Sequence, residues 1–489
     1  MADDTEIPRS MREDASHPPA AHLHRALGIW DLVFLNVSCI FGFSSLAQVA
    51  QFGYGSLLLF VLAILTFLIP SGLMVAELNA RMPEEGGLYL WTGTAFGDLH
   101  GYVAAWTYWL SNIVWMPTIM LLVSISCLYV FGDRYLSLQD NSLFNGIVCL
   151  AVLWGLTALN VLGIDRAKWV QNVGAVANWA CILLLLVVGS IFVLHHGSSQ
   201  PFSPDRLLPD LTDFSLLPYF AIVAFCFGGL ELAPIMAGEI KNPKRDIPRA
   251  IAVSSVAVGL IYMVGTLMLI LIVPEGEIGI IEGVTQAFHL AGAASSVPWG
   301  TIGGILVVLG TLGLLGSWFT GTARIPFVVG LDHYLPDAVA KVHPRWGSPI
   351  NSLLMQATVM TVLFVASVAG STVTEAFLVL LDMSIILYFI PFLYLFASLV
   401  WHMKKNTGGG GVIPMFQRSM RTVWVVAALG FTTTLLSTII SAVPTKDIDN
   451  KVLFMVKVVG GAVVLIGVGL VVYYKKKRDE VEAPRALAP

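Results

Sequence analysis

Charged residues are scarce in this sequence. Only 12% of its 489 residues are Asp, Glu, Lys or Arg, whereas 56% are hydrophobic. Soluble globular domains carry about a quarter charged residues, so this composition excludes an ordinary soluble protein. The formal net charge of −4 gives no indication of a nucleic-acid partner.

The sequence also lacks the motifs of several other protein classes. Its five cysteines lie inside apolar runs without the spacing of a disulfide framework or a metal site. No phosphate-binding loop of the G-x-x-x-x-G-K-[ST] type is present, which argues against ATP as an energy source within this chain. The ten histidines lie mainly in the tail and loops, whereas a metal-dependent membrane enzyme needs His, Asp or Glu clustered in its spans. We therefore expect no metal, no cofactor and no enzymatic activity.

Long apolar segments are what the sequence has in abundance. From Gly28 onward they recur at lengths of about 20 residues, enough for a helix to cross a bilayer. Division at charged and Pro/Gly-rich connectors gives twelve predicted spans, numbered 1 to 12 in chain order: 27–50, 55–79, 99–131, 143–163, 168–194, 214–238, 247–273, 297–323, 350–369, 373–401, 419–443 and 452–474. The sequence therefore predicts an all-α polytopic membrane protein.

The distribution of Lys and Arg predicts the orientation, because cytoplasmic loops of membrane proteins are enriched in both. With the N-terminus inside, only Arg134, Arg206, Lys446 and Lys451 fall on the opposite side, and Lys457 lies within span 12. The remaining 22 of the 27 basic residues share the side of the N-terminus. Both termini are therefore predicted to be cytoplasmic, in what we expect to be a bacterial inner (plasma) membrane.

The same segmentation predicts five regions. Residues 1–26 are polar and have no apolar segment of a signal peptide, so we expect a disordered cytoplasmic tail. A ten-helix core follows over residues 27–401, with halves at 27–194 and 214–401. The rest is predicted to comprise a Gly-rich cytoplasmic linker (402–418), helices 11 and 12 (419–474) and a basic cytoplasmic tail (475–489).

Two of the spans are interrupted by residues that weaken a helix. Span 1 reads GIWDLVFLNVSCIFGFSSLAQVAQFGYG, with polar residues and Gly42 near its middle. Span 6 reads YFAIVAFCFGGLELAPIMAGE, with Gly228 and Gly229 followed by Pro234. The two lie five spans apart, at matching positions of two five-helix halves. Paired interruptions of this kind are typical of inverted-repeat transporters, whose substrate site lies near the membrane midplane.

A broken helix in lipid frees backbone N–H and C=O groups, which is tolerated only where they line a cavity or bind a ligand. Freed N–H groups at a half-helix N-terminus suit a carboxylate, and freed carbonyls suit an ammonium group. An α-amino acid carries both groups. The alternative is that a glycine pair only permits close helix packing. Two interrupted spans in register, together with an acid inside span 6, favour the transporter.

Three stretches also show a family resemblance. They read AELNARMPEEGGLYLWTGTAFGDLHGYVAAWTYWLSN (76–112), AGEIKNPKRDIPRAI (237–251) and TARIPFVVGLDHYLP (322–336). Together they resemble permeases of the amino acid–polyamine–organocation (APC) superfamily, and the first is most similar to bacterial permeases related to the glutamate/GABA antiporter. The resemblance implies the leucine-transporter-type fold, with a five-plus-five inverted repeat and broken helices 1 and 6.

The resemblance further implies a substrate site. In arginine/agmatine antiporters the sixth span carries the motif aromatic, small polar, Phe, any residue, Gly, any residue, Glu, which is similar to residues 225–231 here. Phe225 then corresponds to a substrate lid, Trp318 to an aromatic wall and Glu231 to a proton-linked acid. The resemblance and the two breaks together predict substrate contacts from Asn36, Ser38, Cys39, Ile40, Phe41, Gly42, Tyr108, Ser111, Asn112, Phe225, Cys226, Gly228, Gly229 and Trp318.

Two positions depart from the family pattern. The first span of the family usually breaks at a Gly-Ser-Gly type motif, whereas residues 39–41 here read Cys-Ile-Phe, with Gly42 just beyond. This departure changes the expected geometry for a carboxylate, although Asn36 matches the family. Some members carry a lysine in span 5 that substitutes for sodium, and the corresponding residue here is Asn178. That mechanism is therefore not expected.

Two acids lie within the predicted spans. A charged side chain at a helix centre costs about 2.5–3.5 kcal/mol on insertion scales, so an intramembrane acid indicates a functional site. Burial disfavours the charged form of Glu231, which suits a proton carrier; a neutral, hydrogen-bonded structural role is the alternative. Asp382 lies nine residues after the start of span 10, and proton coupling, a gate contact and a structural role stay open for it. Glu84, Glu85 and Arg324 are candidates for an inner gate, with a solvated loop or an anchor as the alternative.

The predicted function is secondary active transport of amino acids by alternating access, driven by protons or by exchange. Protons are favoured over sodium because an acid is present and no set of sodium ligands can be assigned. Acidic rather than basic intramembrane residues favour zwitterionic or cationic substrates over glutamate. A polyamine or amine transporter of the same fold, a channel and a non-transporting amino-acid sensor are the alternatives. The expected partners are the small-molecule substrate, protons and the lipid bilayer, without nucleic acid, and a homodimer is left open.

Overall fold

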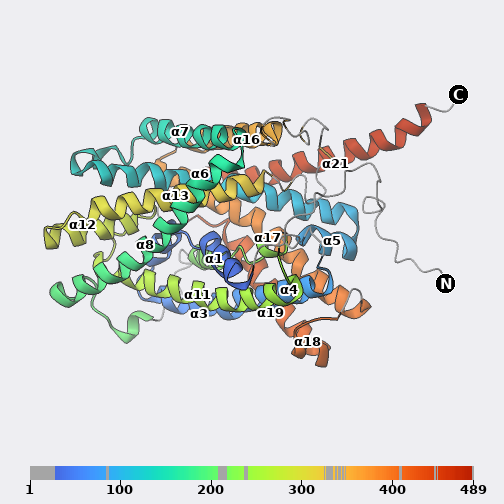
Figure 1. Cartoon of the computed structure of the whole chain (residues 1–489), viewed down its shortest axis with the longest axis horizontal. Coiled ribbons are helices and arrows are strands. Elements are labelled where there is room, and N and C mark those ends of the chain that lie inside the picture. Colours follow the sequence, from blue (N-terminus) through green and yellow to red (C-terminus); the bar gives the residue numbers. More distant parts are fainter. Residues whose placement is uncertain are drawn as a thin grey trace.

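Helices that lie side by side make up the structure (Figure 1). The computed structural model describes residues 28–83, 87–207, 217–235, 240–323, 325, 334–335, 339, 343, 346, 348–369, 371–406, 410–444, 448 and 450–486. A helix satisfies its backbone hydrogen bonds within one segment, which is what an apolar chain in lipid requires.

The first predicted half contains the helices up to the connector after span 5. They are α1 (Ile29–Ile40), α2 (Phe43–Ala50), α3 (Gly55–Ala63), the π-helix η2 (Ile64–Leu68), α4 (Ile69–Arg81), α5 (Leu88–Phe96), α6 (Asp98–Phe131), the 3-10 helix η3 (Asp133–Leu138), α7 (Ser142–Val161), α8 (Ile164–His196) and the 3-10 helix η4 (Pro204–Leu207).

The second predicted half and the C-terminal helices follow. They are α9 (Leu217–Cys226), α10 (Leu232–Ile235), α11 (Pro243–Ile272), α12 (Gly283–Ser295), α13 (Trp299–Thr322), α16 (Ile350–Val368), α17 (Val373–Lys405), α18 (Pro414–Arg418), α19 (Met420–Ile440), α20 (Lys451–Met455), the π-helix η8 (Val456–Gly460) and α21 (Gly461–Ala486).

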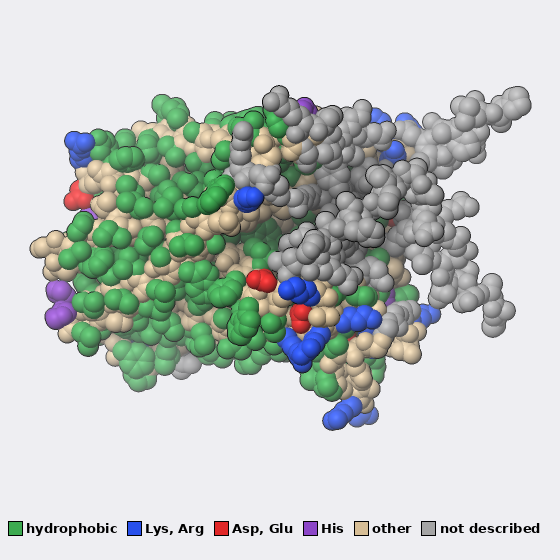
Figure 2. All heavy atoms as spheres, in the orientation of Figure 1, with side chains coloured by type: hydrophobic (Ala, Val, Ile, Leu, Met, Phe, Trp, Pro, Cys, Tyr) green, Lys and Arg blue, Asp and Glu red, His purple; other side chains and the backbone are tan. Residues whose placement is uncertain are grey.

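The protein is an integral membrane protein. Among the described residues, ten helices are long and apolar enough to cross a bilayer, and the bent pair α1 and α2 makes eleven. Figure 2 shows a broad hydrophobic surface across the middle of the molecule. Span 6 corresponds to α9 and α10, and residues 214–216 and 236–238 of that span lie outside the described part. Twelve spans therefore stay a prediction, with which the structure is consistent.

Among the described helices of nine or more residues, two lie outside the predicted spans. They are α5, with 9 residues, and α12, with 13 residues. Neither was predicted, because a short apolar segment gives no clear signal of a span. The π-helical turns η2 and η8 inside spans 2 and 12 were not predicted either.

The helices pack in matched pairs. Helix α6 contacts α17, and α13 contacts α8 in the same way. The contact of α1 with α11 corresponds to that of α9 with α3, and the contact of α8 with α11 corresponds to that of α17 with α4. A shift of five spans converts each pair into its counterpart. Helices α6 and α17 form the centre of the bundle, because 83% of an apolar 18-residue stretch of each is buried. The corresponding share is 17% for the helix Lys451–Arg478.

Candidate functional site

The first predicted break lies between α1 and α2, whose axes differ by 52°. Phe41 and Gly42 are extended there, so the helical hydrogen bonds are interrupted. The Tyr262 hydroxyl on α11 satisfies both sides of the break. It donates to the Ile40 carbonyl (2.8 Å) and accepts from the Gly42 N–H (3.1 Å). The Trp318 indole on α13 donates to the Cys39 carbonyl (3.2 Å). Side chains from α11 and α13, both in the second predicted half, thus bond the backbone groups at this break.

The second predicted break lies between α9 and α10, at the glycine pair. Gly229 has a φ of +119°, which residues with a side chain rarely adopt. A Cβ there would also lie 2.8 Å from Ile40 Cγ1. At Gly228 a Cβ would overlap the Tyr388 hydroxyl of α17. The two glycines therefore permit close packing and a break in the helix at the same time.

Glu231 lies at this second break and is 1% exposed. Its Oε1 accepts hydrogen bonds from the hydroxyls of Tyr388 (2.7 Å) and Tyr108 (3.0 Å). Its Oε2 accepts the Gly229 N–H (2.9 Å). Within the described part of the chain, no Lys or Arg forms an ion pair with it. Neutral donors from α6, α17 and the break itself hold this carboxyl, and a proton can be added or removed there without breaking an ion pair.

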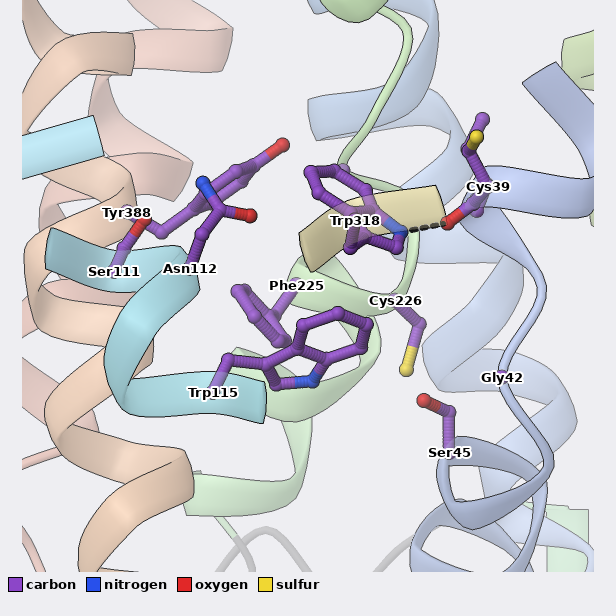
Figure 3. A pocket seen from close by; sticks show the side chains of 12 residues that line it. Cys39, Gly42, Ser45, Ser111, Asn112, Trp115, Phe225, Cys226, Trp318 and Tyr388 are labelled. Carbon is purple, nitrogen blue, oxygen red and sulfur yellow. Dashed lines mark hydrogen bonds between the residues drawn. The ribbon is translucent and has the colours of Figure 1, made fainter. Parts of the chain in front are cut away.

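A small cavity lies between the two breaks (Figure 3), and its volume is about 40 Å³. A cavity needs about 10–15 Å³ by the same measure to hold one water, so this one has room for a few. Its lining residues come from α1, α2, α6, α13, α17 and the α9 break: Cys39, Ile40, Gly42, Ser45, Ser111, Asn112, Trp115, Phe225, Cys226, Gly228, Trp318 and Tyr388.

Four aromatic side chains enclose much of this cavity. The rings of Trp115 and Trp318 meet edge to face with centroids 5.7 Å apart. Phe225 and Tyr388 make a second edge-to-face contact at 5.1 Å. Figure 3 shows the four rings around the gap between α6 and the broken helices. None of the lining residues carries a positive charge.

Most of the predicted substrate contacts come together here. Nine line the cavity: Cys39, Ile40, Gly42, Ser111, Asn112, Phe225, Cys226, Gly228 and Trp318. Tyr108 and Gly229 do not line it but bind Glu231 behind it. The substrate-binding roles of these residues stay predictions.

Three other predicted contacts lie elsewhere. The Asn36 amide donates to the Ser254 hydroxyl of α11 (3.3 Å). Phe41 packs against the rings of Phe43 and Tyr262. Ser38 lines a separate crevice.

The separate crevice lies between α1, α8 and α13 and has a volume of about 570 Å³. Asn178, the residue at the position of the family's sodium-substituting lysine, is among its lining residues. Phe34 and Val176, which also line it, are 56% and 72% exposed, so the crevice opens at the outer surface of the bundle. Cys39 lines both the crevice and the small cavity.

Asp382 on α17 is 1% exposed and does not line the cavity. It precedes Tyr388 by six residues, about 9 Å along the helix. Among the described residues, neither of its carboxyl oxygens has a hydrogen-bond partner. Asp382 therefore does not contact the cavity, and its role in proton coupling stays a prediction. Glu84, Glu85 and Arg324 lie outside the described residues.

Sequence reasoning missed Tyr388 and Tyr262. Both are tyrosines within long apolar helices, and a buried hydroxyl needs a hydrogen-bond partner. That signal marks each as a residue with a polar contact inside the bundle. It does not say that Tyr388 meets Glu231 or that Tyr262 spans the break, because those contacts depend on the packing of distant helices.

Comparisons with known proteins show what this sequence is similar to. The sequence model described as amino acid permease matches residues 27–468. An uncharacterized transporter of Legionella pneumophila is 26% identical over 94% of this chain and 98% of its own length. A probable agmatine/putrescine antiporter of Lactococcus lactis is 23% identical over 92% and 95% of the two chains. A glutamate/gamma-aminobutyrate antiporter of the same species is 22% identical over 86% and 85%.

Proposed function

Because the chain belongs to the amino acid permease family of the APC superfamily, we propose that it moves amino acids across the membrane by alternating access. The family and its antiporter relatives identify it as a transporter of small molecules. The proposal concerns the substrate class and the mechanism. We propose secondary active transport, driven by a proton gradient or by the exchange of one substrate for another.

One observation carries the proposal. The cavity lies where two interrupted helices from different halves of the chain meet, and its lining residues include Ile40, Gly42 and Gly228 at the two breaks. A zwitterion needs donors for its carboxylate and acceptors for its ammonium group, and interrupted helices supply both. No long continuous helix offers such groups in lipid.

Glu231 is the proposed proton carrier. It lies behind Gly228 and Tyr388, next to the cavity but away from direct contact with it. Its two tyrosine partners come from α6 and α17, the central helices of the bundle. Protonation gives the carboxyl a hydrogen of its own, so one of the two tyrosine hydroxyls can then accept from it, whereas the Gly229 N–H can only donate. This supports a coupling between the charge of Glu231 and the arrangement of the helices around it.

The matched helix pairs support two inverted five-span repeats, the leucine-transporter-type architecture. In such transporters one set of helices rocks against the other around a fixed midplane site. We propose that both termini lie in the cytoplasm of a bacterial inner membrane. In Figure 2 most of the visible Lys and Arg side chains lie toward the end of the molecule where α5 and α18 are placed in Figure 1.

The purified protein in proteoliposomes tests this function. Uptake would be measured for a panel of labelled amino acids and amines, with pH and sodium varied independently. We expect saturable uptake of an amino acid that responds to a pH gradient and does not require sodium. A sodium requirement with no response to pH would contradict the proton-coupled mechanism. Uptake of no member of the panel would contradict the transport of amino acids and amines.

Exchange of amines is a second candidate, favoured by the probable agmatine/putrescine antiporter among the relatives. The aromatic rings and the absence of a lining cation suit a cationic substrate. Agmatine or putrescine that accelerates the efflux of the same labelled amine would support it. Acceleration by external substrate also distinguishes a carrier from a channel, which conducts without it, and from a sensor, which transports nothing.

A further inference from the structure

The linker between α17 and α19 carries positive charge at both of its ends. No Asp or Glu occurs between Asp382 and Asp447 in the sequence. Figure 2 shows Lys and Arg side chains where Figure 1 places α18. Four basic residues with exposed side chains lie at the helix ends next to the linker, and we call them the basic cluster: Lys404, Lys405, Arg418 and Arg421. Four cations therefore lie here without an acid on the same segments.

No acid from another segment of the described chain neutralises the basic cluster. Its four residues form no ion pair with a described acid, and no hydrogen bond to a described residue engages their side-chain N–H groups. The basic residues 475–478 on α21 differ, because Asp479 and Glu480 follow them directly. Like charges close to one another repel, and a bound anion removes that repulsion. The basic cluster is therefore the more suitable of the two for an external anion.

An aromatic ring lies beside two of these cations. Lys404 Nζ is 4.7 Å from the centre of the Trp424 ring, a cation–π contact. Trp424 follows Arg421 by three residues, so the two share a face of α19. The tryptophan is 48% exposed. Exposed tryptophans of membrane helices are enriched at the membrane–water interface, at the depth of the lipid headgroups. Lys404 and Arg421 are therefore expected at that depth.

Beyond the cations, α19 continues as an exposed apolar surface. Val425, Leu429, Leu436 and Ile439 recur at helical spacing and are 66%, 41%, 48% and 58% exposed. Only 33% of an apolar 18-residue stretch of α19 is buried. A soluble anion would use the charged end of this surface alone. Cations at one end and an apolar surface beyond them match a ligand with a negative headgroup and hydrocarbon chains.

We propose that Lys404 and Arg421, beside Trp424, bind the headgroup of an anionic phospholipid whose acyl chains lie along α19. Its phosphate accepts hydrogen bonds from the ammonium and guanidinium groups, and such charge-assisted bonds are the strong ones. Lys405 and Arg418 add positive charge around the headgroup. The bound lipid joins the end of α17 to the start of α19 across the linker. This site is separate from the transport cavity and does not depend on the proposed substrate.

Native mass spectrometry of the purified protein tests the proposal. Phosphatidylglycerol and phosphatidylcholine with the same acyl chains are titrated separately, and the first bound lipid is quantified. A basic residue near the membrane surface contributes about fivefold to the binding of an anionic lipid, so the wild type should prefer phosphatidylglycerol by about 25-fold. Lys404→Gln/Arg421→Gln should lose this preference and bind phosphatidylcholine as before. Lys475→Gln/Lys477→Gln removes the same charge from α21, where Lys477 also lies over a ring, and should bind like the wild type.

Further variants guard against a folding defect in the double substitution. Each single change, Lys404→Gln or Arg421→Gln, should cost about fivefold, and Lys404→Arg/Arg421→Lys should keep the preference because it keeps both charges. Equal binding of phosphatidylglycerol by the wild type and all Gln variants of the cluster would overturn the proposal. An equal loss in the α21 control would assign the binding to surface charge in general.

Two other occupants of this surface would also be detected. Displacement of the lipid by an excess of inorganic phosphate would assign the cluster to a soluble anion and overturn the proposal. A dimer that forms only without the lipid would assign the exposed face of α19 to a second copy of the chain, and would overturn it as well. Each of these outcomes leaves the proposed transport function untouched, because none of them measures transport.

Discussion

At the scale of single residues, Glu231 accepts hydrogen bonds from neutral donors and forms no ion pair among the described residues. A substitution that removes its charge therefore leaves no cation without a partner there. Glu231→Gln keeps the size and one acceptor oxygen but cannot titrate. If Glu231 carries the coupled proton, the pH dependence of transport should flatten, while substrate affinity stays within about tenfold, or about 1.4 kcal/mol. The measurement is initial uptake against external pH. Glu275→Gln is the control, because Glu275 lies at the surface in an exposed ion pair with Arg206.

A wild-type pH profile in Glu231→Gln would assign a structural role to this acid. The break at Gly228 and Gly229 would still define the candidate site, but the proton would need another carrier. Asp382 would then be the next residue to test, because both of its oxygens lack a partner among the described residues. Alanine at position 231 is a poorer substitution, since it also opens a cavity next to two glycines.

Single-residue features were only partly accessible from the sequence. An acid in an apolar span is visible directly, because its insertion cost singles it out. Tyr388 gave no comparable signal, since tyrosine is common in membrane helices. Its contact with Glu231 joins residues 157 positions apart and is set by the packing of α17 against the α9 break. Asn36 matched the family pattern, yet it bonds Ser254 instead of lining the cavity.

At the scale of elements, Tyr262 is the residue that stabilises the break between α1 and α2. Tyr262→Phe removes one hydroxyl and leaves both the Ile40 carbonyl and the Gly42 N–H without their partner. Buried groups that lose a partner cost about 1–3 kcal/mol each, so the variant should melt at a lower temperature. Thermal unfolding in detergent measures this. Tyr474→Phe, at a tyrosine that is 57% exposed, is the control and should melt like the wild type. Equal melting of both variants would mean that the break does not depend on Tyr262.

A second element-level contact holds the glycine-rich linker against α4. Glu77 is fully buried, pairs with Arg81 (2.8 Å) and accepts the N–H groups of Val412 and Ile413, each at 2.9 Å. A Cβ on Gly411 would overlap the Glu77 carboxyl, whereas one on the neighbouring Gly410 would meet nothing. The linker that joins span 10 to span 11 is therefore attached to the bundle at one defined position.

This pair of glycines gives a matched test. Gly411→Ala should destabilise the protein by about 1–3 kcal/mol, the usual cost of overpacking a filled site. Gly410→Ala should leave stability unchanged or slightly raised. Thermal melting and limited proteolysis after residue 406 would report both effects. Equal behaviour of the two variants would show that the linker is not held at Glu77.

The elements themselves could largely be predicted, and for a physical reason. A long apolar run has to be helical in lipid, so eleven of the predicted spans coincide with long helices or with the bent α1–α2 pair. Both breaks were visible because glycine and polar residues interrupt those runs. The helices α5 and α12 were missed since they are too short to be spans. The contact of the linker with Glu77 was missed because it depends on tertiary packing alone.

At the scale of the whole molecule, the two halves of the core contact one another in pairs that a shift of five spans interchanges. Repeats inserted in opposite orientation require an odd number of spans in each half. The predicted five spans per half, followed by the two more that are predicted, would place both ends of the chain on the same side of the membrane. The number of spans in the repeat therefore determines whether the two termini share a side, and one labelling experiment tests both.

The last prediction concerns this orientation. We expect Ser10→Cys and Ala488→Cys to be protected from a membrane-impermeant maleimide added to intact cells, and to react once the cells are opened. Ser137→Cys, in the exposed η3 turn between spans 3 and 4, should react in intact cells. The wild type supplies the background, because its five cysteines lie in helices predicted to span the membrane. Labelling of only one terminus from outside would require an odd number of spans and would contradict the twelve-span arrangement. Labelling of both termini but not of Ser137→Cys would still require an even number of spans but would invert the protein, and the excess of basic residues would then lie outside.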